Sequence, residues 1–241
     1  MELIKFGIQG LDEVLKGGVR PDSSILLTGP PGTGKSIAAF QFIYNGAKQG
    51  IPGLYITSEE NVISLREHMV SLGFKELLNL EKKGLITIAE QSVTSGKMLS
   101  IKAPVKLIAK KKIKRVVLDS LTLFEFVYGT SVNEFRKGII SFITQMKATS
   151  VTLVVTSERY TAELDRFEFR SEDFLFDGVI ILSKIRKGSS FERIIFISKL
   201  RGQDHLIDVF PFQIGQGGLK VFPKQLPFSL IEQDVLKKTK K

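Results

Sequence analysis

One eight-residue segment constrains the fold of this chain more than any other feature: residues 29–36 read Gly-Pro-Pro-Gly-Thr-Gly-Lys-Ser. An apolar run, Ile25 to Thr28, precedes the segment, and residues 37–40 after it have the composition of a helix. The pattern G-x-x-x-x-G-K-[ST] between a strand and a helix is typical of a loop that wraps a polyphosphate. Its glycines let backbone N–H groups converge on an anion at the helix N-terminus. The segment therefore predicts nucleotide binding.

The residues of this loop have separate predicted roles. Lys35 is expected to reach the β- and γ-phosphates, where it would also assist catalysis. The Ser36 hydroxyl is expected to bind Mg²⁺ together with phosphate oxygens and water. The residues predicted to contact the nucleotide here are Pro31, Gly32, Thr33, Gly34, Lys35, Ser36 and Ile37.

Length and composition favour a single domain. The 241 residues are 43% hydrophobic and 25% charged, and we expect one domain over residues 1–236 with a basic tail at 237–241. No apolar run approaches the ~20 residues that a membrane-spanning helix needs, and the N-terminus lacks the layout of a signal peptide. The sequence contains no cysteine, which excludes a disulfide framework and a thiolate metal site. These features predict a cytoplasmic protein that does not act at a membrane.

The formal net charge of +10 raises the question of nucleic-acid binding. Much of the charge is concentrated in two places, four lysines in the last five residues and five basic residues between Lys110 and Arg115. Both clusters are interpreted first as solvated surface charge, and the second also suits the C-terminal end of a helix. Nucleic acid stays open as a partner but is not favoured.

Short apolar strands alternate with amphipathic helices over the first 156 residues. Strands are expected at 23–28, 53–57, 85–89, 116–120 and 151–156, and helices around 11–15, 37–47, 62–72, 97–112 and 132–146. Pro104 is expected to disturb the middle of the fourth helix, and residues 131–134 form a capping box before the fifth.

After Gly178 the rhythm changes. Expected strands at 179–183 and 191–198 leave no room for a helix between them, and 206–212 and 219–222 follow as two more. We therefore expect an α/β fold built from βαβ units. It would have a mostly parallel central sheet, helices on both faces and an antiparallel C-terminal extension.

Acidic residues follow two of the expected strands. Asp119 ends an apolar strand and is the predicted second contributor to the Mg²⁺ site, usually acting through water. Glu59 and Glu60 follow another strand, where a carboxylate can accept the proton of an attacking water. Ligands in open α/β sheets bind at these strand ends. Glu59 is the preferred catalytic base because it lies closer to the strand.

Seven motifs occur here in the order seen in KaiC-like ATPases of the RecA/RadA superfamily, and the resemblance covers about residues 5–222. The motifs are Gly7-Ile-Gln-Gly-Leu-Asp, Gly29 to Ser36, Ser58-Glu59-Glu60, Val116-Val-Leu-Asp119, Phe176-Asp-Gly-Val179, Lys199-Leu-Arg-Gly202 and Phe210-Pro-Phe-Gln-Ile214. The resemblance implies a RecA-like P-loop NTPase fold. It also implies ATP or ADP with Mg²⁺ at the interfaces of a homo-oligomeric ring, expected to be a hexamer.

The same resemblance assigns residues that spacing alone does not. It makes Glu59 and Glu60 the catalytic pair, and it implies that Lys199 and Arg201 reach the γ-phosphate of a neighbouring subunit. Gln203, His205 and Ser71 match positions that line the nucleotide in that family. By spacing alone, Lys199 and Arg201 are two exposed cations on one side of a strand.

The leading hypothesis is a Mg²⁺-dependent ATPase that forms a ring and regulates an unidentified protein partner. One alternative is a DNA-binding recombinase paralogue, although residues 157–176 carry six acids against three arginines, which disfavours phosphate contacts. The other alternative is a scaffold that binds nucleotide as a switch and hydrolyses it negligibly. Autokinase activity is not expected from a single domain of this kind. The preference for ATP over GTP leaves no readable pattern.

Overall fold

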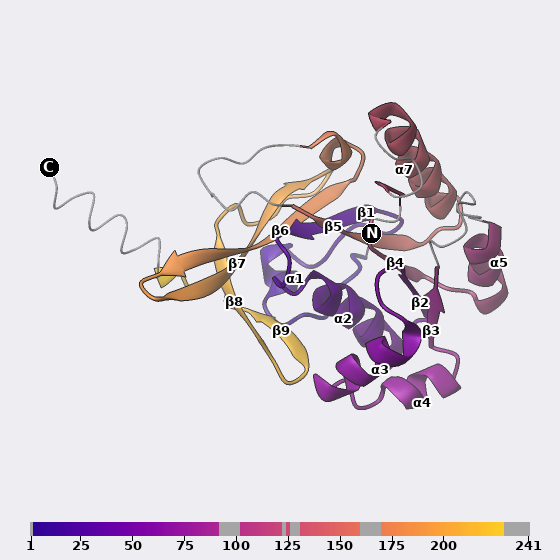
Figure 1. Cartoon of the computed structure of the whole chain (residues 1–241), viewed down its shortest axis with the longest axis horizontal. Coiled ribbons are helices and arrows are strands. Elements are labelled where there is room, and N and C mark those ends of the chain that lie inside the picture. The colour runs from indigo at the N-terminus through magenta and orange to yellow at the C-terminus, as the bar shows by residue number, and fades with distance from the viewer. Residues whose placement is uncertain (1, 92–101, 122–123, 126–130, 160–169, 229–241) are drawn as a thin grey trace, which may run out of the picture.

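The computed structural model describes residues 2–91, 102–121, 124–125, 131–159 and 170–228. Within these residues one sheet has helices on both of its faces (Figure 1). Its strands are β1 (Ser24–Gly29), β2 (Gly53–Thr57), β3 (Ile86–Glu90), β4 (Arg115–Asp119), β5 (Thr152–Glu158), β6 (Gly178–Lys187), β7 (Ser190–Leu200), β8 (Phe210–Gly215) and β9 (Gly218–Val221). They lie in the order β3-β2-β4-β5-β1-β6-β7-β8-β9.

The sheet has a parallel part and an antiparallel part. The pairings from β3 through β6 are all parallel, whereas β6–β7, β7–β8 and β8–β9 are antiparallel. This arrangement confirms the predicted α/β fold with an antiparallel C-terminal extension. Because β1 lies between β5 and β6, the strand that precedes the glycine-rich loop is central and paired on both sides.

Helices cover the two faces of the sheet. They are α1 (Leu11–Val14), α2 (Lys35–Lys48), α3 (Val62–Ser71), α4 (Leu77–Lys82), α5 (Lys102–Lys111) and α7 (Val132–Lys147), with a 3-10 helix, η1, at Ser171–Phe174. Helices α1 to α4 contribute to one hydrophobic core, and α5 and α7 contribute to the other. Figure 1 shows the same division, with α2, α3 and α4 on one side of the sheet and α5 and α7 on the opposite side.

Strand β1 separates the two cores. Ile25 and Leu27 point into the core beneath α2, and Leu26 points into the core beneath α7, as the two-residue period of a strand requires. All six residues of β1 are buried. A strand covered on both faces reads as a continuous apolar run, which is why its position was predictable from the sequence.

Two details differ from the sequence predictions. Helix α4 was not predicted, because six residues carry too short an apolar period. The strand expected at 206–212 begins only at Phe210, since the Leu206 N–H donates to the Val14 carbonyl instead of a neighbouring strand. In the region of the fourth expected helix, Pro104 is the third residue of α5 as described. Residues 97–101 lie outside the described residues, so the expected disturbance by Pro104 stays a prediction.

No helix among the described residues is both long enough and apolar enough to cross a bilayer.

We expect Gly29→Ala to destabilise the protein strongly. Gly29 has φ +152°, and a Cβ there would lie 1.9 Å from the backbone carbonyl oxygen of Leu182 on the paired strand β6. The steric clash should cost ~1–3 kcal/mol, and the backbone angle should cost a non-glycine residue a further ~1–2 kcal/mol. We therefore expect the free energy of unfolding, measured with urea, to fall by about 3 kcal/mol. Gly84→Ala is the matched control, because Gly84 has φ +72° but nothing within 4 Å of its Cβ position. Equal losses for the two variants would contradict this contact.

Candidate active site

The loop between β1 and α2 is curved by two glycines with positive φ. Gly32 has φ +68° and Gly34, the N-cap of α2, has φ +101°. The Lys35 ammonium lies inside the curve and donates to the carbonyls of Gly29 and Pro30 at 3.0 and 3.1 Å. The Thr33 hydroxyl donates to the Pro30 carbonyl at 2.8 Å and closes the loop on itself. The strand, loop and helix predicted around this segment are therefore present.

Parallel pairing brings the ends of several strands to the edge of the sheet where this loop lies. Gly29 is level with Glu158 of β5, and Thr57 is level with Asp119 of β4. They border a cavity of about 530 Å³ whose lining residues are Pro31, Gly32, Gly34, Lys35, Ser36, Ile37, Glu59, Asp119, Ser120, Thr156, Glu158, Arg193 and Ile214. The cavity thus brings together most of the phosphate-loop residues and two of the acids that the sequence singled out.

Lys35 is a buried cation without a close ion pair among the described residues. Its side chain is about nine-tenths buried, and burial lowers the pKa of Lys35, an effect that the charges of Glu158, Asp119 and Glu59 oppose. A buried ammonium bonded only to carbonyls leaves positive charge facing the cavity. An anion entering the loop would restore the balance.

Asp119 is a buried carboxylate surrounded by hydroxyl groups. It accepts hydrogen bonds from Tyr55 Oη at 2.5 Å and from the Thr156 hydroxyl, and the nearby Ser36 hydroxyl also favours its ionised form. Burial raises the pKa of Asp119, and these donors only partly oppose it. Burial and the neighbouring Asp119 charge also raise the pKa of Tyr55 well above its usual value.

The donor set at Asp119 fits a hydrated Mg²⁺. A carboxylate and the Ser36 hydroxyl are hard oxygen ligands, and Mg²⁺ in phosphate sites keeps several waters and uses one or two protein oxygens. Within the described residues Asp119 forms no ion pair, so the carboxylate has an unmet electrostatic demand for a cation. No group of three His, Asp or Glu side chains that could hold a metal without a substrate occurs there either.

The adjacent acids Glu59 and Glu60 face different neighbours. The Glu59 carboxylate accepts a hydrogen bond from the Ser120 hydroxyl and lines the cavity. Glu60 Oε1 lies 2.5 Å from Nδ1 of His68 on α3, and its backbone N–H donates to the Thr57 hydroxyl at 3.2 Å. The two carboxylates therefore lie in different environments.

Two cations of the β6–β7 hairpin reach the loop, and the sequence reasoning missed both. Arg193 lines the cavity, and its buried Nε has no hydrogen-bond partner among the described residues. Lys184 is its cross-strand partner, and Lys184 Nζ lies 3.4 Å from the point where a Cβ atom on Gly32 would be. A usable signal existed: counting back from the turn at residues 187–190 pairs Lys184 with Arg193. What the sequence did not show is that this hairpin pairs beside β1.

The predicted cations of the C-terminal region lie at the opposite end of the sheet. Leu200 pairs with Gly178, which is level with Ile25 at the start of β1, whereas the loop follows the end of β1. Along the strand direction, Arg201 is thus about 17 Å and Lys199 about 10 Å from the end of β1 where the loop of their own chain begins. Burial lowers the pKa of Lys199, and the nearby Arg201 charge lowers it further.

Three further predicted residues make contacts within the chain. The Gln203 amide donates to the carbonyls of Leu15 and Gly18 at 2.8 and 2.6 Å. His205 Nδ1 lies 3.0 Å from the Leu206 carbonyl. Ser71 ends α3, where its hydroxyl donates to the His68 carbonyl at 2.8 Å, and it is not among the residues that line the cavity.

Comparisons with known proteins agree on one family. A family model described as "ATPase: KaiC" matches residues 4–226. The circadian clock oscillator protein KaiC of Parasynechococcus marenigrum is 33% identical over 226 residues, which are 90% of this chain and 44% of that protein. The circadian clock oscillator protein KaiC 1 of Synechocystis sp. is 32% identical, covering 92% of this chain and 44% of the relative.

Solved structures include a KaiC-like protein of the hyperthermophilic archaeon Pyrococcus horikoshii. It matches with a TM-score of 0.80 and 32% identity, over 92% of this chain and 99% of that one. This chain therefore spans less than half the length of the curated relatives but nearly the whole of the archaeal structure.

We expect Asp119→Asn to stabilise the ligand-free protein while removing the part of its response to nucleotide that depends on Mg²⁺. Because the pKa of Asp119 is higher in the folded protein than its ordinary 3.8, the ionised carboxylate costs stability at neutral pH. Removing that charge should raise the free energy of unfolding by on the order of 1 kcal/mol, which is the energy that corresponds to a pKa shift of about one unit. The gain should shrink as the pH falls towards 3.8, since the wild-type side chain then becomes protonated too.

Thermal unfolding at several pH values, with and without Mg-ATP, tests this expectation. Ligand at about 100 times its dissociation constant should stabilise the wild type by about 2.7 kcal/mol, and the Asn variant should lose the part of this gain that needs Mg²⁺. A variant that is less stable than wild type at pH 7, or that keeps the full response to Mg²⁺, would show that Asp119 has a different role.

Proposed function

This chain belongs to the KaiC family of RecA-like ATPases, and from that premise we propose that it hydrolyses ATP with Mg²⁺ at the interfaces between identical subunits. One observation carries the proposal: the groups expected to act on one nucleotide lie at opposite ends of the same sheet. The cavity, Lys35 and Glu59 are at one end, and Lys199 and Arg201 are at the other. A head-to-tail ring, with a hexamer as the expected form, brings the two ends of neighbouring subunits together.

Nucleotide binding in this proposal uses the backbone and cations of the cavity. The N–H groups of the loop surround the β- and γ-phosphates at the N-terminus of α2, and Lys35 exchanges its two carbonyl acceptors for phosphate oxygens. Arg193 and Lys184 add positive charge from the hairpin. Ile214 supplies an apolar wall, suited to the face of a base, beside the bare backbone of Gly34.

Metal binding falls to the Ser36 hydroxyl and, through water, to the Asp119 carboxylate. When bound, Mg²⁺ neutralises charge that develops on the β- and γ-phosphate oxygens. Tyr55 and Thr156 hold the Asp119 carboxylate in place by hydrogen bonds.

Hydrolysis requires a base, and we assign that role to Glu59. A water held by the Glu59 carboxylate attacks the γ-phosphorus, its proton passes to Glu59, and the bond from the γ-phosphorus to the bridging oxygen breaks with release of ADP and phosphate. The Ser120 hydroxyl orients Glu59 by donating to Oε1. Lys199 and Arg201 of the next subunit stabilise the charge of the transition state.

The named activity of the curated relatives supports a regulatory setting for this ATPase. They are circadian clock oscillator proteins, and they are about twice as long as the part that this chain matches. We propose that the nucleotide state of the ring is read by an unidentified protein partner.

Two adjacent substitutions test the assignment of the base. Glu59→Gln should lower kcat by ~10²–10⁴-fold, the usual contribution of a general base, while nucleotide binding is kept. Glu60→Gln should lower kcat by less than about tenfold, because its carboxylate faces His68 rather than the cavity. Phosphate release and binding of a fluorescent ATP analogue measure the two quantities, with Lys35→Ala as the variant that loses affinity. The reverse order of the two kcat losses would assign the base to Glu60.

Mixed assemblies test the shared site. Arg201→Ala alone should reduce turnover by ~10³–10⁵-fold, as the loss of such a cation does in other nucleotide hydrolases. Mixing it with Glu59→Gln/Glu60→Gln protein should restore part of the activity, since some interfaces then combine an intact base with an intact Arg201. Native mass with and without Mg-ATP confirms assembly. Mixed rings that assemble but stay inactive would exclude catalysis between subunits.

A further inference from the structure

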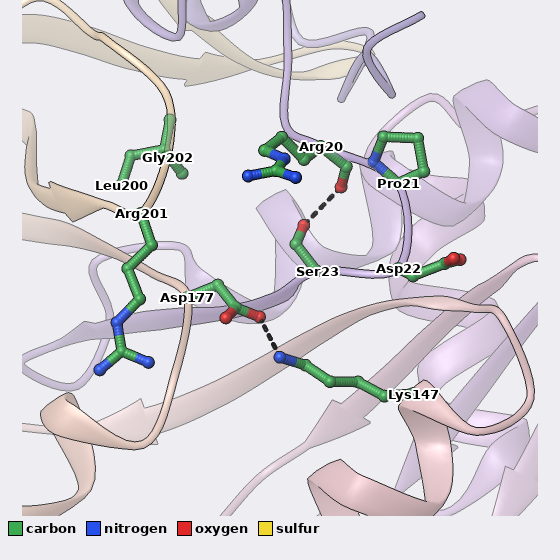
Figure 2. Close-up of a pocket in the computed structure, with 9 residues that line it drawn as sticks. All are labelled: Arg20, Pro21, Asp22, Ser23, Lys147, Asp177, Leu200, Arg201 and Gly202. Atoms are coloured by element: carbon green, nitrogen blue, oxygen red, sulfur yellow. Dashed lines mark hydrogen bonds and ion pairs between the residues drawn. The ribbon is translucent and has the colours of Figure 1, made fainter. Parts of the chain in front are cut away.

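Asp177 joins three parts of the fold, and Figure 2 shows one of these connections, its ion pair with Lys147. Its carboxylate accepts hydrogen bonds from the backbone N–H and the hydroxyl of Ser24, both at 2.8 Å, where β1 begins. The same oxygen, Oδ2, lies 2.7 Å from Lys147 Nζ at the end of α7. Its backbone carbonyl accepts the N–H of Arg201 at 2.8 Å. One residue therefore connects a central strand, a long helix and the turn that follows β7.

The charge of Asp177 is matched to these donors. Burial alone would raise the pKa of Asp177, but the Lys147 ammonium and the two Ser24 donors outweigh burial and lower it below its ordinary value. The carboxylate is therefore ionised and paired at neutral pH. Side-chain exposures of 20% for Asp177 and 40% for Lys147 make this pair less solvated than a typical surface ion pair.

The turn after β7 is held on its other sides as well. Gly202 has φ +66°, and its Cβ position is only 2.4 Å from Nη1 of Arg20, so the Arg20 guanidinium packs against the bare backbone of the turn. The Arg201 guanidinium donates to the Phe174 carbonyl of η1 at 2.8 Å. Two bonds from the Gln203 amide attach the following residues to the segment between α1 and β1. Arg20, Lys147, Asp177 and Arg201 all border one pocket of about 260 Å³ (Figure 2).

We propose that Asp177, Lys147 and Arg20 are positioning residues, which hold the Lys199–Gly202 turn in the orientation that presents Arg201 to the nucleotide of the next subunit. The inference rests on the proposed function, because that function gives the turn its target. A catalytic group displaced by about 1 Å can lose on the order of 100-fold in rate. An exposed turn that carries such a group therefore needs anchors of its own.

The anchoring has a geometric consequence for the whole subunit. Ser24, which binds Asp177, begins β1, and Gly29, which leads into the phosphate loop, ends it. A single buried strand thus sets the distance between the phosphate loop, which binds the subunit's own nucleotide, and the turn that presents Arg201 to the nucleotide of the next subunit. Movement of the turn relative to β1 requires Asp177 to release either Ser24 or the Arg201 N–H.

Substitutions of Lys147 and Arg20 test the positioning role in the full-length chain. Lys147→Ala should lower kcat by about 10- to 100-fold, with unchanged affinity for a fluorescent ATP analogue and unchanged ring mass. Lys147→Arg, which keeps the charge, should recover most of kcat. Lys137→Ala is the matched control: it removes an exposed ion pair with Glu134 from the same helix and should leave kcat unaltered. Arg20→Ala should reproduce the loss of kcat from the other side of the turn, and it serves if Lys147→Ala does not fold.

A double-mutant cycle separates positioning from general destabilisation. If Lys147 acts through Arg201, then Lys147→Ala/Arg201→Ala should have the same kcat as Arg201→Ala alone. Losses that multiply in the double variant would overturn the inference, as would wild-type kcat in both Lys147→Ala and Arg20→Ala. Failure of the proposed function appears differently, as wild-type kcat in Arg201→Ala itself.

Discussion

The pairing of β1 with a parallel strand on each side is the constraint on which the rest of this structure depends. With β5 on one side and β6 on the other, β1 has no freedom to shift, and its apolar residues contribute to both hydrophobic cores, Ile25 and Leu27 to one and Leu26 to the other. The loop that leaves one end is therefore held by the centre of the sheet. So is the Asp177 network at the other end, which holds the turn after β7. The loop that binds the subunit's own nucleotide and the turn that serves the neighbouring subunit are therefore both attached to β1.

At the loop end, the fold keeps charges that its own contacts do not neutralise. Lys35 is buried against carbonyls, and burial raises the pKa of Asp119, whose hydrogen-bond donors among the described residues are hydroxyl groups. At the other end Asp177 has a lowered pKa and a full set of donors. The two carboxylates differ in what their pKa shifts indicate. A raised pKa in a cavity, as at Asp119, indicates a charge that costs stability and is kept for a ligand. A lowered pKa with a full set of donors, as at Asp177, indicates a charge that supports the structure.

Local patterns explain why much of the fold was predictable and why some of it was not. Strands β1, β2 and β4 are short apolar runs buried on both faces, and Ser131 caps α7 as its capping box predicts. Helix α4 has too few residues for a period, and the segment before β8 follows α1 instead of pairing, which is a tertiary preference. Arg193 was not predicted as a site residue because its position beside the loop depends on a tertiary contact, the pairing of β6 with β1.

The sequence by itself determined the chemistry of the loop, the type of fold and the identity of the acids at the strand ends, because each depends on residues that are neighbours along the chain. Only the tertiary structure decided that Glu59 faces the cavity while Glu60 turns to His68, and that Arg193 joins the loop. It also decided that Arg201 lies about a strand length from the loop of its own chain. These outcomes depend on strand order and on the register between distant segments, and no local spacing encodes either.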